Sequence, residues 1–413
     1  MISTLLVLGY ILAKVSVKNK SQQDFLVELF SVLPLMRGRM NFCNMARYSK
    51  FNEVTFRRNF SKYFNWVGFN YEAIRLGLSS PSSECIGAVD ASFVSKSGKK
   101  TFGLGKFWSG VANTTLKGLE ISALALIEVS TGMAWTLDVS QTPSNLSPKE
   151  GSEDSYTRID YYIEQLLDCN KYLTGVLYIV ADGYYAKQKM FAAISFMNKH
   201  LITKLRPDAN MRYLLDRKKN PNAHGNKKYD SKVNWESLDL NRWIDLGVHP
   251  KFDHLLVYTQ ELYSVNLKQN LKVVILINTN TGKYVLLAST NLFQSALQII
   301  HFYALRFQIE FLFRDAKQFT GLTHGQARDE QKMDFHFNMS LAALNVYQLQ
   351  MNLSQQQHTS MNSFIRRAHN AKLVNLIFDQ LRSKAELTEF LDPNHPDIQK
   401  IINLGRMEYK KAA

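Results

Sequence analysis

The spacing of apolar residues divides the chain into a helical start and a middle that is rich in short strands. Up to about residue 85, apolar positions recur at the intervals of an amphipathic helix. From Ile86 onward, short unbroken apolar runs replace this period, as in buried strands. Strands are predicted over Ile86–Asp90, Gly103–Trp108 and Leu119–Val129. A helix, a strand, a helix and a strand are expected next, over Asp160–Cys169, Gly175–Asp182, Ala186–Lys199 and His200–Arg206.

The character of the chain changes again after Pro207. Arg217–Lys228 is a polar, basic segment with Pro and Gly, which is typical of a loop. Three β-like runs follow it, Leu255–Tyr258, Leu262–Asn266 and Leu271–Asn278. A return strand is then predicted over Lys283–Thr290, a long helix over Leu297–Gln318, and further helices from about Gln350.

These elements predict an α/β protein built from several parts. The parts are a helical N-terminal domain at 1–85, a first core segment at 86–207, a β-rich insertion at 208–283, a second core segment at 284–349 and a helical C-terminal region at 350–413. A chain of 413 residues is long enough for more than one domain.

One helical face carries an unusual row of polar residues. At 3.6 residues per turn, Tyr303, Arg306, Glu310 and Lys317 fall within roughly a 60° arc, and Arg314 points the same way. A core helix would not carry these charges, and a solvated helix has no reason to align them beside a tyrosine. Glu310 is a good metal ligand in this row, and its cationic neighbours suit phosphate oxygens.

Two aspartates follow apolar runs upstream of this helix. Asp90 ends the run from Ile86, and Asp182 ends the run from Leu177. An acid at the carboxyl end of a strand lies at the rim of an α/β sheet, where ligands bind. Asp182 precedes a glycine, so a turn-forming role is the alternative for that residue alone. Together with Asp90 and Glu310, however, it favours one shared site.

The spacing Tyr-x2-Arg-x3-Glu-x6-Lys over residues 303–317 resembles the signature of bacterial insertion-sequence transposases of the insertion-sequence-four family. The resemblance implies a ribonuclease H-like core, a mixed sheet flanked by helices, with a β-rich insertion before the glutamate. It also implies an enzyme that cleaves DNA at the ends of its element and transfers strands into target DNA. Asn291 stands where the family often has an aspartate, so no metal role is assigned to it.

The same resemblance implies the metal chemistry. Asp90, Asp182 and Glu310 would form the catalytic triad and hold two Mg²⁺ ions, or Mn²⁺ in their place. Asp90 would bridge both ions, Asp182 would bind one and Glu310 the other. Two divalent ions about 3.5–4 Å apart activate the attacking oxygen and stabilise the leaving oxygen of a phosphodiester.

The charge of the chain favours a polyanionic partner. The formal net charge is +15, which fits nucleic acid first, although a basic enzyme without a DNA role is also compatible with it. The resemblance implies double-stranded DNA, both element ends and target, and a homodimer in the DNA complex. The residues expected to contact DNA are Tyr303, Arg306, Arg314, Lys317, Arg57, Arg58, Lys218, Lys219, Lys227 and Lys228.

Arg57 and Arg58 belong to a possible helix-turn-helix. Two short helical patterns flank a turn at Ser49–Asn52, but a helical packing domain with a solvated cationic face explains them equally well. Trp235 and Trp243 lie near the basic loop and could stack on an unpaired base, although a buried position is the simpler reading of each.

The remaining features bear on location and on competing functions. Three scattered cysteines without a CxxC motif fit a reducing cytoplasm, and the apolar start, Met1–Lys14, is too short to span a bilayer. A cytoplasmic protein without a membrane role is therefore expected, and the resemblance implies a bacterial protein that is associated with the nucleoid when bound to DNA. His324, His336 and His358 show no zinc-binding spacing. The alternatives to a transposase are a related metal-dependent nuclease and an inactive DNA-binding remnant.

Overall fold

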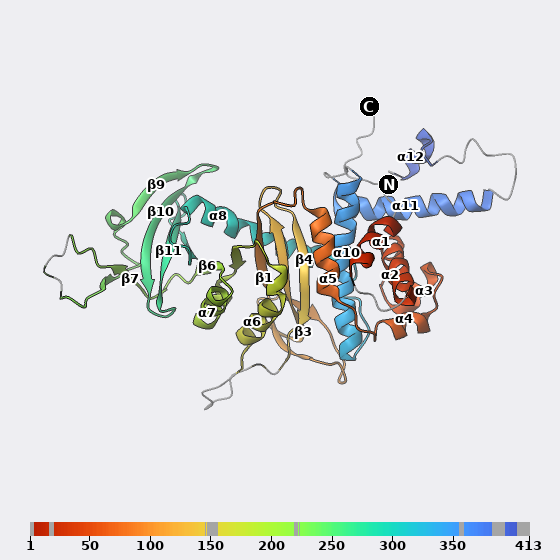
Figure 1. Ribbon diagram of the computed structural model, residues 1–413, viewed down its shortest axis with the longest axis horizontal. Helices are drawn as coiled ribbons and strands as arrows, with labels where there is room; N and C mark the ends of the chain where they lie inside the picture. Colours follow the sequence, from red (N-terminus) through yellow and green to blue (C-terminus); the bar gives the residue numbers. More distant parts are fainter. Residues whose placement is uncertain are drawn as a thin grey trace.

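The computed structural model describes residues 4–15, 20–144, 146, 156–218, 222, 224–354, 359–381 and 393–402. The protein has a mixed α/β architecture in which helices flank a mixed sheet (Figure 1). The described helices are α1 (Thr4–Lys14), α2 (Lys20–Val32), α3 (Phe42–Tyr48), α4 (Glu53–Asn59), α5 (Trp66–Gly77), α6 (Arg158–Cys169), α7 (Gln188–Phe196), α8 (Ala296–Leu305), α9 (Phe307–Phe319), α10 (Glu330–Leu353), α11 (Met361–Leu381) and α12 (Pro396–Ile402). Among the described residues, no helix combines the length and the apolar character needed to cross a bilayer.

The described strands form one twelve-stranded sheet. They are β1 (Cys85–Ser95), β2 (Gly105–Ser109), β3 (Thr114–Glu128), β4 (Ala134–Gln141), β5 (Tyr178–Ala181), β6 (His200–Leu205), β7 (Met211–Leu214), β8 (Tyr229–Lys232), β9 (Ile244–His249), β10 (Phe252–Ser264), β11 (Gln269–Asn278) and β12 (Tyr284–Ser289). Their order is β2-β3-β1-β5-β6-β12-β11-β10-β7-β8, with β4 paired to β3 and β9 paired to β10.

The strands nearest the core mix both directions of pairing. β1 pairs antiparallel with β3 and parallel with β5, and β5 pairs parallel with β6. Parallel pairs need crossover connections, and α6 and α7 occupy those two connections. Residues of α6 and α7 pack in one apolar cluster against the sheet, whereas α8 and α9 belong to a second cluster that includes Ile86 and Ala88. Alternate residues of β1 therefore face opposite helical layers.

The N-terminal helices share a core with the sheet. α10 packs against both β4 and α5, and in Figure 1 it stands between the sheet and the α1–α4 group. Phe25 of α2 lies 6.4 Å, ring centroid to ring centroid, from Phe335 of α10, and Trp66 of α5 lies 4.9 Å from the same ring. These rings are buried in the same apolar cluster as Trp135 of β4. The helices before residue 85 thus contribute to one continuous apolar core.

Segment 208–283 contains β7 to β11 and joins the same sheet. β11 pairs with β12 from Lys272↔Ser289 to Ile277↔Tyr284, and β12 pairs with β6 of the core. The runs predicted separately at Leu255–Tyr258 and Leu262–Asn266 join into one strand, β10, which ends at Ser264, because the polar residues between them keep the β pairing with β11. These strands form the end of the molecule that lies farthest from α3 and α4 (Figure 1).

Strand β4 was missing from the sequence prediction. Its residues Trp135, Leu137 and Val139 are buried, and they alternate with Thr136 and Asp138. This alternation was a usable signal for a strand. β4 pairs with β3, and α5 and α10 cover it, which explains why the β3–β4 edge is buried.

Candidate active site

Asp90 lies in the middle of a strand, which corrects the prediction that its apolar run ends there. β1 continues to Ser95 because β3 pairs with it as far as Ser95↔Gly118. The parallel pairing of β1 with β5, in contrast, ends at Val89↔Ala181. Asp90 and Asp182 are therefore the residues that directly follow this parallel pairing, so the two acids lie at the same level of the sheet, and Asp90 is still paired with Ala123 of β3.

Asp182 begins a tight turn. Its Oδ1 accepts a hydrogen bond from the Tyr184 backbone N–H at 2.8 Å, and its backbone carbonyl accepts one from Thr203 Oγ1 at 2.8 Å. A Cβ at Gly183 would lie 3.1 Å from the Lys204 carbonyl oxygen, so a larger residue would crowd β6. Asp182 thus forms a turn, because one of its carboxylate oxygens caps it. The same residue also lies at the level of Asp90 on the neighbouring strand.

The row of polar residues lies on two helices, where one was predicted over Leu297–Gln318. α8 ends at Leu305 and α9 begins at Phe307, with Arg306 between them. The Arg306 N–H bonds to the Tyr303 carbonyl, and the Ile309 N–H bonds to the Arg306 carbonyl, each three residues away. These three-residue bonds tighten the chain locally and interrupt the α-helical ladder. Arg306 itself keeps right-handed helical dihedral angles, φ −51° and ψ −36°.

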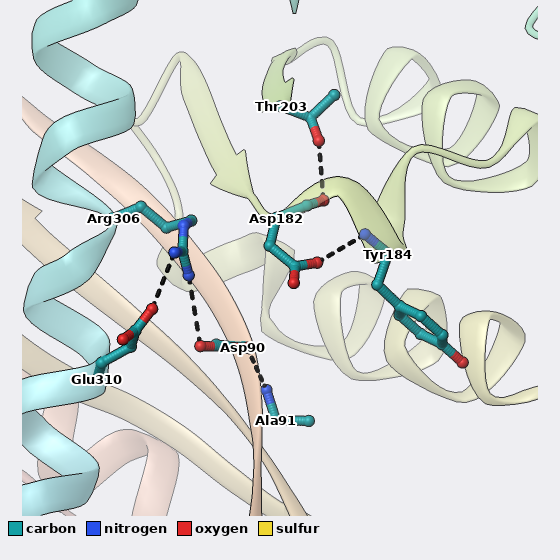
Figure 2. A network of polar contacts seen from close by, with 7 residues as sticks. All are labelled: Asp90, Ala91, Asp182, Tyr184, Thr203, Arg306 and Glu310. Carbon is teal, nitrogen blue, oxygen red and sulfur yellow. Dashed lines mark hydrogen bonds and ion pairs between the residues drawn. The ribbon is translucent and has the colours of Figure 1, made fainter. Parts of the chain in front are cut away.

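Arg306 joins two of the predicted acids (Figure 2). Its Nη1 lies 3.5 Å from Asp90 Oδ2, and its Nη2 lies 2.8 Å from Glu310 Oε1. The Arg306 side chain is only 7% exposed, whereas that of Glu310 is 46% exposed. Asp182 lies beside this pair in Figure 2. We refer to Asp90, Asp182, Glu310 and Arg306 together as the acid site.

The acid site holds more negative charge than its buried surroundings favour. The pKa of Asp90 is raised to about 7, chiefly by burial and also by the nearby Asp182 and Glu310 carboxylates, while the Arg306 guanidinium opposes this change. Burial also raises the pKa of Tyr303. A carboxyl group with such a pKa accepts a proton or a cation readily at neutral pH.

Lys317 and Arg314 differ in their surroundings. Lys317 Nζ donates a hydrogen bond of 2.8 Å to Ser92 Oγ, and burial lowers the pKa of this lysine. Ser92 stands two residues after Asp90 on β1, so both side chains face α9. Sequence reasoning missed Ser92, although the period of two from Asp90 could have indicated it. Arg314 is more than half exposed and pairs with Asp315 at 2.9 Å.

The donor chemistry of the acid site fits a hard divalent cation, since three carboxylates offer only oxygen ligands. Within the described part of the chain, however, no group of three His, Cys, Asp or Glu side chains is arranged to hold one metal ion. Between Asp90 and Glu310, the guanidinium of Arg306 supplies the positive charge. The three carboxylates are thus ligands of the kind that Mg²⁺ prefers, but two of them point toward an arginine in this structure.

The other residues expected to contact DNA lie apart from the acid site. Arg57 and Arg58 are exposed on α4, and the turn Ser49–Asn52 separates α4 from α3, beyond α10 from the sheet (Figure 1). Lys218, Lys227 and Lys228 are exposed in the loop between β7 and β8, near the opposite end of the molecule. Lys219 lies outside the described residues.

The two tryptophans near that loop are structural. Trp243 is buried, and its Nε1 donates to Tyr213 Oη at 3.2 Å. Trp235 is half-buried and donates from Nε1 to the Ala209 carbonyl at 2.6 Å. The Trp243 ring is therefore not available to stack on a base. Its buried position is the simpler of the two alternatives that the sequence offers.

Carboxylates clustered beside a buried cation are typical of sites that act on phosphate esters, because carboxylates in general bind divalent ions and cations bind phosphate oxygens. Residues 16–243 match the family model described as DDE superfamily endonuclease, and the chain belongs to this family. The match spans Asp90 and Asp182 and ends before Glu310. No curated protein matches the sequence. Family membership indicates an enzyme of the transposase or nuclease type with DNA as its substrate, in a family that generally uses divalent metal ions.

Proposed function

We propose that this protein is a transposase of the insertion-sequence-four type, which cleaves DNA at the ends of its element and transfers the cut strands into target DNA. The observation that carries the proposal is the convergence of Asp90 and Glu310 on Arg306, with Asp182 on the next strand. These residues come from three distant parts of the chain, and the Tyr303–Lys317 signature contributes two of them.

The core strands support a ribonuclease H-like fold. The order β4-β3-β1-β5-β6 has β1 antiparallel to β3 and parallel to β5, with helices in the two parallel crossovers. In that fold, the first strand and the next parallel strand carry the first two acids, which matches Asp90 and Asp182 here.

Asp90, Asp182 and Glu310 would hold two Mg²⁺ ions, or Mn²⁺ in their place. When bound, such ions supply activation of the attacking oxygen and stabilisation of the leaving oxygen. Arg306 and Lys317 would hold phosphate oxygens of the cut strand, since Arg306 pairs with two of the acids and offers a planar set of donors, and Lys317 bonds to Ser92, two residues after Asp90. Tyr303 would hydrogen-bond a neighbouring phosphate.

The partners follow from the same proposal. Double-stranded DNA, as element ends and as target, would contact Arg314 near the acid site and Arg57 and Arg58 on α4. The exposed lysines 218, 227 and 228 would contact it in the β7–β8 loop. A homodimer would form on the DNA, and the protein would act in the bacterial cytoplasm, at the nucleoid.

Incubation with Mg²⁺ and DNA that contains the element's ends tests this proposal. We expect strand cuts at the ends and a joined product with a second duplex. Glu310→Ala should lose both products, whereas Asp315→Ala, which removes an acid on the same helix outside the acid site, should keep them. Cutting without a joined product would favour the nuclease alternative, and products that survive Glu310→Ala would overturn the assignment of the site.

A further inference from the structure

A second region of the molecule has the geometry of a ligand site. A cavity of about 1310 Å³ lies between the α3–α4 pair and the far end of β1. Segment 39–45, with Glu53 and Arg57, forms one wall. Ser95–Ser97 and Lys117 of the sheet form another, and the chain from Thr323 to Asp329, with Lys332 and His336, forms the third. We refer to this cavity as the basic groove.

The charges that line the basic groove do not balance. Six cations line it, namely Arg39, Arg57, Lys96, Lys117, Arg328 and Lys332, against the two carboxylates Glu53 and Asp329. Glu53 is engaged by Arg57, and Asp329 by Lys332, in both cases within the same helix or at its cap. In the part of the chain that the structure describes, the other four cations form no ion pair with a carboxylate.

Like charges lie close together in this groove. Lys96 Nζ donates to the Gly325 carbonyl, and its pKa is lowered by burial and by the nearby Arg328. Burial and the nearby Arg39 likewise lower the pKa of His324. Cations that approach one another without a carboxylate raise the energy of the unliganded protein, and an anion placed among them relieves that repulsion. Because these cations come from all three walls of the groove, an extended anion satisfies more of them than a single small ion does.

We propose that the basic groove binds the sugar-phosphate backbone of duplex DNA at a distance from the acid site. This inference rests on the proposed function, because that function is the reason for naming DNA as the polyanion. β1 connects the two regions, since it runs from Asp90 past Ser92, which accepts a hydrogen bond from Lys317, to Ser95, and Lys96 follows directly after its end. Six residues of strand span about 20 Å at roughly 3.3 Å per residue. At about 3.4 Å per phosphate along one strand, the groove contacts DNA some six nucleotides from the acids.

Cys43 gives a direct probe of the groove in the unaltered protein. It lines the cavity and is exposed, whereas the other two cysteines, Cys85 and Cys169, are buried. We expect a random-sequence 30-base-pair duplex, added without metal ions, to slow the alkylation of Cys43 by iodoacetamide as the protein becomes saturated. Inorganic phosphate at the same phosphate concentration should leave the rate unchanged. If the duplex binds by fluorescence anisotropy and Cys43 reacts at its free rate, the groove is not the binding surface. Equal protection by inorganic phosphate would reduce it to a small-anion site.

A charge-matched pair of variants separates the groove from the overall charge. Lys117→Ala with Arg328→Ala removes two exposed groove cations, and Arg75→Ala with Lys171→Ala removes two exposed cations elsewhere. For the groove variant, we expect the slope of log affinity against log salt to fall by about two and the protection of Cys43 to be lost. The control should keep both properties, and equal slopes in the two variants would overturn the proposal. Because neither measurement uses cleavage, an inactive enzyme with a protected Cys43 would refute the proposed function and leave the groove in place.

Discussion

The acid site and the basic groove lie along one strand, and they differ in whether their cations are paired with carboxylates. In the acid site, the buried Arg306 is held between Asp90 and Glu310, so these three charges each have a partner of opposite sign. In the basic groove, Lys96 lies near Arg328, and no carboxylate pairs with either among the described residues. The charge of a paired arginine is neutralised within the protein. Unpaired cations, in contrast, leave a positive potential that a bound anion neutralises.

The two regions are also unbalanced in opposite directions. Burial and neighbouring acids raise the pKa of Asp90 to about 7, whereas burial and a neighbouring cation lower the pKa of Lys96. The first region therefore favours an added cation and the second an added anion. A metal-dependent enzyme that acts on a polyanion needs one region of each kind, arranged along the path of its substrate.

The largest expected effect is the loss of chemistry without the loss of DNA binding. Asp90→Ala, Asp182→Ala or Glu310→Ala should each lower the cleavage rate by a thousandfold or more, because residues that act as a unit cannot replace one another. The affinity for a 30-base-pair duplex, measured by anisotropy without metal, should stay within about threefold, because the basic groove is untouched. A variant that cuts at the original rate would remove its residue from the site, and a parallel loss of binding would merge the two regions into one.

The next effect concerns the pairing of Arg306. Arg306→Ala leaves Asp90 buried without its cationic partner, which should lower the free energy of unfolding by about 4 kcal/mol in urea denaturation. Arg314→Ala removes an exposed arginine on the same row and should cost less than about 1 kcal/mol.

Magnesium should separate the charge effect from lost packing. If Arg306 substitutes for a cation, added Mg²⁺ will stabilise Arg306→Ala more than the unaltered protein. Equal stabilisation of the two proteins by Mg²⁺ would show that Arg306 does not occupy a cation's place.

More of the acid site than of the basic groove could be predicted from the sequence, and the reason is physical. Glu310, Arg306 and Lys317 are linked by helical period, and Asp182 follows a strongly apolar strand, so local spacing indicated all four. The position of Asp90 within β1 depended on pairing with the distant β3, which no local pattern contains. The helix break at Arg306 likewise depended on tightened backbone bonds that the apolar pattern does not encode.

The basic groove was outside the reach of local patterns altogether. Arg39, Lys96, Lys117 and Arg328 come from four separate segments, and only the packing of α3 and α4 beside the sheet brings them together. In the sequence, they contributed only to a net charge of +15. That charge indicated a polyanionic partner without indicating where it binds.

A third prediction tests the wall of the groove through pH. His336 is buried there, with Nε2 2.9 Å from the Gly321 carbonyl oxygen, and burial lowers its pKa to about 4. The unfolded chain therefore binds a proton that the folded protein excludes, and stability is lost as pH falls from about 6.5 toward 4. Between pH 7 and pH 5, this histidine should account for a loss of about 2 kcal/mol.

Urea denaturation of His336→Gln at both pH values isolates that contribution. The variant is expected to be less stable at pH 7, since Gln does not reproduce the imidazole shape, but to lose about 2 kcal/mol less on acidification. His324→Gln serves as a control, because His324 is less buried and should change the pH dependence less. An unchanged pH dependence in His336→Gln would mean that the folded protein accommodates the charged imidazole.

The smallest expected effects come from single charges at the α3–α4 wall of the basic groove. Arg57 lines the groove and pairs with Glu53, whereas Arg58, the next residue, does not line it. Arg57→Ala should weaken duplex binding and lower the salt slope by about 0.9, and Glu53→Gln should strengthen binding because it removes a negative charge from the same wall. Titration of a random 30-base-pair duplex from 50 to 200 mM salt measures both changes.

Replacing Arg57 and Arg58 together asks whether α3 and α4 also read sequence. If they form a DNA-reading helix-turn-helix, the double alanine variant should lose more affinity for element ends than for random duplex, because base contacts add to phosphate contacts only on the correct sequence. Equal losses on both DNAs would make this wall a nonspecific clamp, consistent with phosphate binding in the basic groove.

Opposite effects of Arg57→Ala and Glu53→Gln on random duplex would support the groove in either case, because backbone binding responds to the sign of the charge alone. If both substitutions weakened binding equally, the Arg57–Glu53 pair would act by fixing the shape of α4, and the contrast between a paired acid site and an unbalanced groove would not extend to this wall.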